Sequence, residues 1–397
     1  MTDDSVDADA DPVAAALSRV RRHDFHPVDE RNFTIDRGLG VDGIADLEDP
    51  DWRVRLFAVA GLVRAATAER GTSEAGTDGA GTNALAAIRD GLASNDPHVR
   101  YVCAMALGIA GGEPVNSSPA GVSPSTVDAL VERLQTDPND LVRSQAAIAL
   151  GQLGATDTLE VLEHARENDS RDVAHQAAVA IHRIETGATV TPDLAAAYRD
   201  LDPATLDPDS FDRVRTGETA PGFTLPTTDG ERWDVTAHRE RGKWLVLIWI
   251  FADWCPVCHR EFDELIELRN AFADEDVAVA TVECHDAYRG RLMVGEELEP
   301  AYWFAEESFV ETYREEIWWP HLLDRAGAVG ARWGVDPLAF AVHAEYINRP
   351  GTFVIDPEGV LRFAYVGTYW GDRPSIEETL ELIRTGSFEY EHPERRG

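Results

Sequence analysis

The chain has 397 residues, of which 44% are hydrophobic, so it is long enough and apolar enough to build two or three folded domains. Its 72 acidic and 36 basic residues give a formal net charge of −36, and the lack of a basic stripe argues against a nucleic-acid partner. The most apolar run, 244–252, is too short to span a bilayer, and the acidic start MTDDSVDADADP lacks the pattern of a secretory signal. We therefore expect a cytoplasmic protein in a reducing compartment, with no membrane partner.

The acidic residues are spread through every segment, and Lys243 is the only lysine. Charge gathered in one tail or patch would favour a basic partner. An even distribution is typical instead of proteins from salt-accumulating halophiles, because molar salt shortens the Debye length to roughly 3 Å and screens the self-repulsion. The composition therefore predicts a halophilic protein.

Residues 1–45 form an acidic segment that we expect to be partly disordered. Residues 46–190 repeat one pattern, in which an Asp-Pro or Asp-Ser turn caps a helix rich in Ala, Leu, Ile and Val at helical spacing. The four copies are 49–66, 96–111, 137–154 and 169–184, and the later three follow second helical stretches at 84–93, 126–134 and 156–165. The low-complexity inserts GTSEAGTDGAGT and GGEPVNSSPAGVSPS predict exposed loops between helices.

Three of the four copies keep a Val-Arg pair near the start of the helix, and the fourth has Val173-Ala174. Paired helices with this start resemble HEAT-like repeats, of the short kind related to phycobilisome-lyase repeats. The resemblance implies an all-α solenoid that buries its core by stacking neighbours and offers a concave face to a protein partner. The alternative is that these helices only support the second domain.

Residues 191–214 indicate a linker punctuated by prolines, with one short helix around 193–199. Beyond it, a buried strand, a Cys-x-x-Cys motif, a helix and a second apolar strand form a unit that is typical of a parallel sheet. The predicted elements are the strand 244–251, the helix 256–272, the strands 277–284, 352–355 and 361–366, and the helix 376–384. The last two strands are expected to pair antiparallel across the turn Asp-Pro-Glu-Gly.

This order of elements resembles a thioredoxin-like fold, and four local sequences are similar to its redoxin branch, the alkyl hydroperoxide reductase/thiol-specific antioxidant family. They are APGFTLPTTDGE, GKWLVLIWIFADWCPVCHREF, WPHLLDRAGAVGARWGV and NRPGTFVIDPEG, in that order along the chain. The resemblance implies an enzyme with an α/β thioredoxin-like domain over residues 215–388, which leaves 389–397 as a tail.

The expected chemistry lies in the stretch Trp254-Cys255-Pro256-Val257-Cys258. Cys255 stands at the start of a helix that begins with Pro256, so free backbone N–H groups and the helix dipole should lower its pKa from ~8.5 to ~3.5–7.5. Cys258 follows one helical turn later on the same face, within reach of a disulfide. We therefore predict Cys255 as the attacking nucleophile and Cys258 as the resolving thiol, with their redox-active disulfide in place of any cofactor. Trp254 is expected to shield the pair on one side.

Trp249 stands where many relatives carry a buried carboxylate or amide, so another group must take the proton from Cys258. Glu261 matches the acid that the family commonly has three residues after the second cysteine, and it is our first choice. Asp253 and His259 are the alternatives. Each of these three is more usually a solvated helix or loop residue.

Pro350 and its neighbour Arg349 bear on which reaction the pair performs. Pro350 resembles the family's cis-proline, which would place the Arg349 backbone where a substrate chain can pair with it. The segment PVCHRE also resembles that of peroxiredoxins, in which Cys258 would attack peroxide and Cys255 would replace a threonine. On that alignment Phe251 replaces a proline, and the arginine that steadies the peroxide falls on Pro350, next to Arg349.

Cys284 ends the second apolar strand, and parallel pairing should bring it to the edge that carries the Cys-x-x-Cys motif. It is a candidate third redox thiol or a buried strand-end cysteine. A zinc site would need two ligands besides the motif, and no second Cys-x-x-Cys or His-x-x-x-His spacing exists, so we predict no metal. The insert that follows carries Trp303, Phe304, Trp318 and Trp319, for which we expect core packing, with a roof over the site or docking on the solenoid as alternatives.

Together these patterns predict an acidic helical solenoid that carries a thioredoxin-like domain. The expected function is thiol–disulfide exchange with a protein disulfide substrate or redox partner, recruited through the solenoid. Two alternatives stay open: a thiol peroxidase with antioxidant activity, and a non-catalytic redox-sensing interaction protein.

Overall fold

The computed structural model describes residues 59–64, 66, 84–111, 124–188, 194, 197–198, 214–239, 241–295, 316–335, 340–342, 344–367 and 373–390. The predicted segment 1–45, most of the first repeat, nearly all of both inserts and most of the linker lie outside these residues, as do Trp303 and Phe304. Contacts divide the chain into two compact units, whose largest parts are Pro50–Leu206 and Asp207–Val342.

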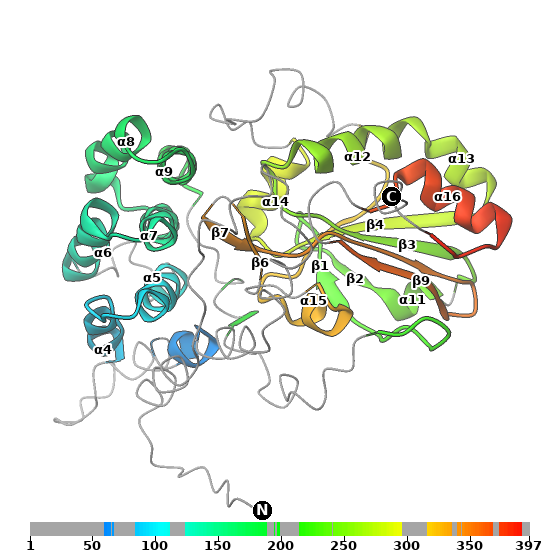
Figure 1. Cartoon of the computed structure of the whole chain (residues 1–397), viewed down its shortest axis with the longest axis horizontal. Helices are drawn as coiled ribbons and strands as arrows, with labels where there is room; N and C mark the ends of the chain where they lie inside the picture. The colour runs from blue at the N-terminus through cyan, green and yellow to red at the C-terminus, as the bar shows by residue number, and fades with distance from the viewer. Residues whose placement is uncertain are drawn as a thin grey trace, which may run out of the picture. The chain divides into compact units, whose positions relative to one another are not determined.

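The described part of the N-terminal unit is helical, and its helices form consecutive antiparallel pairs in two layers (Figure 1). The pairs are α4 (Ala84–Gly91) with α5 (Pro97–Gly111), α6 (Pro124–Thr136) with α7 (Asp140–Leu153), and α8 (Leu159–Asn168) with α9 (Arg171–Thr186). A short 3-10 turn, η3 (Thr156–Thr158), leads into α8. The paired helices that the repeats predict are therefore confirmed for the second to fourth copies.

Glycine lets the helices of one layer, α5, α7 and α9, approach closely. A Cβ atom on Gly108 would lie 2.9 Å from the Cα of Ala149, and one on Gly151 would lie 2.8 Å from the Cα of Ala180. Because these obstacles are backbone atoms, a larger residue would push the helices apart. The Ala-Leu-Gly sequence shared by the second and third copies therefore marks the points where neighbouring repeats cross.

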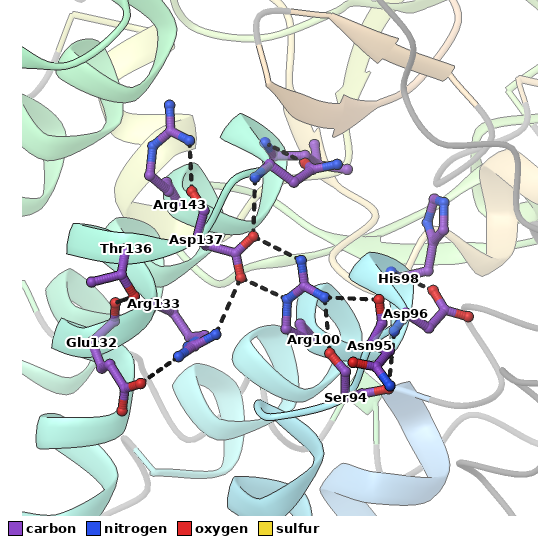
Figure 2. A network of polar contacts seen from close by, with 12 residues as sticks. Ser94, Asn95, Asp96, His98, Arg100, Glu132, Arg133, Thr136, Asp137 and Arg143 are labelled. Carbon is purple, nitrogen blue, oxygen red and sulfur yellow. Dashed lines mark hydrogen bonds and ion pairs between the residues drawn. The ribbon is translucent and has the colours of Figure 1, made fainter.

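A buried ion pair joins the second repeat to the third (Figure 2). Arg100, in the first turn of α5, donates from Nε and Nη2 to the two carboxylate oxygens of Asp137, at 2.6 and 2.8 Å. Arg143, at the same place in α7, binds Asp169 in the same way, at 3.0 and 2.9 Å. The arginine of the Val-Arg pair thus fixes how each of these repeats stacks on the next.

Replacing Asp137 with Ala should lower the free energy of unfolding of the helical unit by about 3–5 kcal/mol, because the Arg100 guanidinium would stay buried without its partner. The matched control is Glu132→Ala, which removes an exposed partner of Arg133 and should cost less than about 1 kcal/mol. Denaturant unfolding followed by far-UV circular dichroism at fixed salt measures both. Equal losses in the two variants would contradict a special role for the buried pair.

The C-terminal unit is built on a five-stranded sheet with the order β5-β4-β3-β8-β9. Its strands are β3 (Trp244–Trp249), β4 (Val277–Glu283), β5 (His321–Leu323), β8 (Gly351–Ile355) and β9 (Leu361–Val366). Strand β4 is parallel to β3 and β5, and β8 is antiparallel to β3 and β9, so both predicted pairings are confirmed. Two short pairs lie outside this sheet: β1 (Thr224–Pro226) with β2 (Arg232–Asp234), and β6 (Phe340–Val342) with β7 (Glu345–Ile347).

Helices cover both faces of the sheet (Figure 1). One face carries α12 (Pro256–Glu267), α13 (Arg269–Asp274) and α16 (Ile376–Thr385), the other carries α11 (Val235–Arg239) and α15 (Ala328–Trp333), and α14 (Ala287–Met293) follows β4. Alternate residues of β3 enter the two cores, Val246 and Ile248 on one face and Leu247 and Trp249 on the other. Burial on both faces explains the unbroken apolar run of this strand.

The predicted helix 256–272 is two helices, because the backbone turns at Leu268, with φ −88° and ψ 6°. Trp319 is buried, and Trp318 packs against the same core, so the expected core packing is confirmed for these two residues. Within the described residues, no helix is both long enough and apolar enough to cross a bilayer.

Candidate active site

The Cys-x-x-Cys motif forms the N-cap and first turn of helix α12, after a short loop that follows β3. Cys255 is the N-cap residue of α12 and Pro256 is its first residue, as the sequence predicts. The Cys255 sulfur accepts a hydrogen bond from the Cys258 N–H at 3.3 Å. The two sulfurs lie 2.7 Å apart, and both cysteines are free thiols. The pair is therefore placed to close into a disulfide without a large backbone movement.

Both thiols are removed from solvent. Cys255 is 1% exposed and Cys258 is 0% exposed, and they share an apolar cluster with Trp254, Phe251 and Phe262. Trp254 stacks on Phe251, with ring centroids 6.5 Å apart. This position fits the shielding role expected of Trp254. A protein disulfide can therefore reach either sulfur only after local opening of the surrounding residues.

The expected drop in the pKa of Cys255 is wrong for this folded state. Burial raises the pKa of the Cys255 thiol well above its usual value, and the hydrogen bond and charge of Cys258 raise it further. The hydrogen bond from the Cys258 N–H and the charge of Arg373 lower the pKa of Cys255, but they do not offset the effect of burial. The argument from the helix N-terminus assumes a solvated thiol, and burial reverses its sign.

A buried ion pair lies beside Cys258. Arg373, just before α16, binds both carboxylate oxygens of Glu261 on α12 and donates Nη1 to the Trp249 carbonyl oxygen at 2.6 Å. Its Nη2 lies 4.0 Å from the Cys258 sulfur, and the Phe251 N–H points at the same sulfur from 3.5 Å. Cys258 therefore faces one cation and one backbone donor.

The electrostatics of this pair favour a charged arginine. Burial alone would lower the pKa of Arg373, but the charges of Glu261 and Cys258 raise it above its ordinary value. Burial raises the pKa of Glu261, and the Arg373 charge only partly offsets this. Glu261 is thus a buried partner of a guanidinium, whereas a glutamate at such a helix position is more usually solvated. Sequence reasoning missed Arg373, because 112 positions separate it from Glu261 and no local spacing links them.

Asp253 and His259, the alternative proton acceptors, are also buried rather than solvated. The Asp253 Oδ1 atom accepts from Arg289 on α14, at 2.6 Å from Nε and 2.5 Å from Nη2. The His259 Nε2 atom lies 2.5 Å from the Asp253 carbonyl oxygen and must be the donor, since a carbonyl only accepts. Burial lowers the pKa of His259 to about 4, so its ring is neutral at pH 7.

The end of β4 buries Glu283 between two histidines. The Nε2 atom of His321 lies 3.3 Å from Oε1, and the Nδ1 atom of His285 lies 3.4 Å from Oε2. Burial alone would raise the pKa of Glu283, but the hydrogen bonds and charges of these rings lower it to about 2. In the parts of the chain that the structure describes, no three His, Cys, Asp or Glu side chains gather to hold a metal ion.

Cys284 follows directly after β4. It is partly buried and packs against the apolar cluster that contains the two cysteines of the motif, and it follows β4 at the expected edge, where the parallel strand β3 also ends. Its reactivity as a third redox thiol stays a prediction.

The features expected at Pro350 and Arg349 are absent. The described residues contain no cis peptide bond, so the peptide bond before Pro350 is trans and the expectation of a cis-proline is wrong. The Arg349 N–H donates to the Val335 carbonyl oxygen at 2.8 Å, and this use within the fold makes it unavailable to a substrate chain. Arg349 is itself buried, and the guanidinium that contacts Cys258 comes from Arg373 instead.

Known proteins resemble both parts of this chain. Residues 216–364 match the AhpC/TSA family, and residues 120–205 match HEAT repeats. The thioredoxin-like protein YneN of Bacillus subtilis is 26% identical over 171 residues, which cover 43% of this chain and 81% of that protein. Alkyl hydroperoxide reductase E of Mycobacterium tuberculosis is 30% identical over 152 residues, 38% of this chain and 84% of that protein. The thiol:disulfide interchange protein DsbE of Pseudomonas fluorescens is 30% identical over 162 residues, 41% of this chain and 72% of that protein.

The buried, neutral ring of His259 makes stability depend on pH. Its pKa is near 6.5 in the unfolded chain and about 4 in the folded protein, so between these values the unfolded chain binds more protons. The free energy of unfolding should therefore fall as the pH drops from 6.5 to about 4, by up to about 3 kcal/mol from this residue. Urea unfolding at intervals across this window should give a flatter slope for His259→Gln. The same slope in both proteins would mean that the His259 ring is not held neutral by the fold.

Proposed function

Because the chain belongs to the AhpC/TSA family, we propose that it is a thiol–disulfide oxidoreductase whose working pair is Cys255 and Cys258. The observation that carries the proposal is the 2.7 Å separation of two free thiols at the start of α12. Two thiols held this close have a high effective concentration toward each other, so a mixed disulfide on one is rapidly resolved by the other. The disulfide between them is the only redox group that the proposed cycle needs.

In the proposed cycle, the Cys255 thiol gives up its proton, and the thiolate that results attacks one sulfur of a substrate disulfide. A mixed disulfide forms, and the first substrate sulfur leaves as a thiolate that takes up a proton. Cys258 then loses its proton and attacks the Cys255 sulfur, which closes the Cys255–Cys258 disulfide and releases the second substrate thiol. Two electrons and two protons pass from the protein to the substrate. A low-molecular-weight thiol or another reduced protein restores the dithiol.

Glu261 and Arg373 are proposed to manage the proton of Cys258. When that proton passes to Glu261, the guanidinium exchanges its carboxylate partner for the Cys258 thiolate, 4.0 Å from Nη2. The number of buried charges stays the same, which matters because an additional unpaired ion in this interior is costly. The raised pKa of Glu261 supports the transfer, because it makes this carboxylate a better proton acceptor.

The HEAT repeats are proposed to recruit the protein that carries the substrate disulfide. Stacked repeats offer an extended surface that is suited to protein binding. A cytoplasmic location and work in molar salt, both suggested by the composition, belong to the same proposal.

The Cys258→Ser variant should accumulate a mixed disulfide between Cys255 and a peptide disulfide, because the resolving thiol is gone. The Cys255→Ser variant should form none, and turnover of an insulin-type disulfide in molar KCl should fall to background in both. Mass spectrometry after acid quenching measures the adduct. Cys103→Ser is the matched control, because Cys103 is buried in α5, and it should keep wild-type turnover. An adduct on Cys258 in the Cys255→Ser variant would reverse the two roles.

A second candidate function is peroxide reduction, which the position of Arg373 favours. The Cys258 thiolate would attack one peroxide oxygen, break the O–O bond, release water or an alcohol and become a sulfenic acid. Condensation with the Cys255 thiol would then give the disulfide and water. The peroxiredoxin alignment puts its arginine at Pro350, but Arg373 supplies a guanidinium from another element of the fold.

If peroxide reduction is the reaction, Arg373→Met combined with Glu261→Gln should slow the oxidation of Cys258 by about 10²-fold or more, because the buried thiolate loses its cation. The second substitution avoids an unpaired carboxylate, and Arg384→Met on the exposed end of α16 is the control. Stopped-flow tryptophan fluorescence with hydrogen peroxide measures the rates. Fast oxidation that survives in Cys255→Ser and vanishes in Cys258→Ser would make peroxidase the main function. Slow oxidation of the wild-type protein would exclude it.

A further inference from the structure

The residues on either side of the Cys-x-x-Cys motif are tied to each other and to helix α14. Asp253 lies two positions before Cys255, and His259 directly follows Cys258. The His259 Nε2 atom donates to the Asp253 carbonyl oxygen at 2.5 Å, which joins the two ends of the motif. The carboxylate of the same Asp253 binds Arg289 at 2.5 and 2.6 Å. The backbone that leads into Cys255 is therefore held at two points.

Helix α14 is itself anchored to the sheet. Asp286 caps it by accepting from the Arg289 N–H at 3.2 Å. The next residue, Gly290, faces the sheet so closely that a Cβ there would lie 2.9 Å from Oε1 of Glu283 and 2.6 Å from Cδ2 of Leu323. A larger residue at this position would have to displace these two buried side chains, and Glu283 is held in turn by the two histidines described above. Arg289 thus reaches Asp253 from a rigid support on β4 and β5.

We propose that Arg289, Asp253 and His259 form a clamp that positions Cys255 against Cys258 and thereby sets the reduction potential of the pair. The inference rests on the proposed function. The stability of the disulfide depends on the effective concentration of the two thiols, which falls when their separation fluctuates. Releasing the backbone at Asp253 lets Cys255 move away, so the disulfide becomes easier to reduce. The three are positioning residues, because they act through the backbone before Cys255.

The redox equilibrium of the full-length protein with dithiothreitol tests the clamp, with the reduced and oxidised forms separated by alkylation and mass. His259→Leu removes the hydrogen bond, and His259→Gln returns a donor to the same carbonyl oxygen. We expect the disulfide of His259→Leu to be about tenfold easier to reduce, which is ~30 mV, and that of His259→Gln to approach the wild-type value. His238→Leu is the matched control and should change nothing, because this buried histidine lies on α11 and stacks against Trp233.

Should His259→Leu fold poorly, Arg289→Met combined with Asp253→Asn removes the other contact of the clamp and should shift the equilibrium in the same direction. Equal shifts in His259→Leu and His259→Gln would overturn the clamp, because packing of the ring rather than its hydrogen bond would then be responsible. An unchanged equilibrium in all variants, with a disulfide still formed in the wild-type protein, would overturn the clamp and leave the proposed function intact. Absence of the Cys255–Cys258 disulfide in the wild-type protein would overturn both.

Discussion

The redox site depends on one constraint: each carboxylate that is buried near the ends of the sheet strands must have a partner. An isolated ion in an interior of low dielectric costs several kcal/mol or more, so a buried carboxylate needs a cation or hydrogen-bond donors. Glu261 has Arg373, Asp253 has Arg289, and Glu283 has two histidines. Except for the contact between Glu283 and His285, each pairing joins segments that are distant in the sequence. The two thiols are therefore packed among apolar side chains rather than in water, and a charge that develops on the Cys258 sulfur meets the Arg373 guanidinium, which is already in place.

The solvent exposure of the two sulfurs distinguishes disulfide exchange from peroxide reduction better than the identity of the surrounding residues does. A sulfur that is 1% exposed cannot meet the disulfide of a folded partner unless the start of α12 opens, whereas a small peroxide needs only a narrow passage. The ion pairs that stabilise the closed form resist this opening. Disulfide exchange with a folded protein requires these ion pairs to break, whereas reduction of a small peroxide does not. The strength of the ion pairs therefore decides which of the two substrates can react with the cysteine pair.

The features that the sequence predicts well are those with local signals. The apolar run of β3, the N-cap position of Cys255 and the Asp-Pro helix starts of the second and third copies each lie within a few residues, and the structure has all of them. The partners and burial of the site residues could not be predicted, because they depend on contacts between residues far apart in the sequence. Arg373 and Glu261 meet across 112 positions, and the rise in the pKa of Cys255 follows from packing by residues of several elements. The break between α12 and α13 at Leu268 could not be predicted, because no glycine or proline marks it in the sequence.

The equivalence of the two ion pairs between repeats has a consequence for how such an array changes length. Arg100 and Arg143 occupy the same position in their helices, and Asp137 and Asp169 lie just before α7 and α9, the next helices of the same layer. If the third repeat were excised, Arg100 would meet Asp169 through the contact that it now makes with Asp137. Duplicating a repeat would likewise supply a donor and an acceptor together. Gene duplication and deletion could therefore lengthen or shorten the array by whole repeats without a new interface having to evolve.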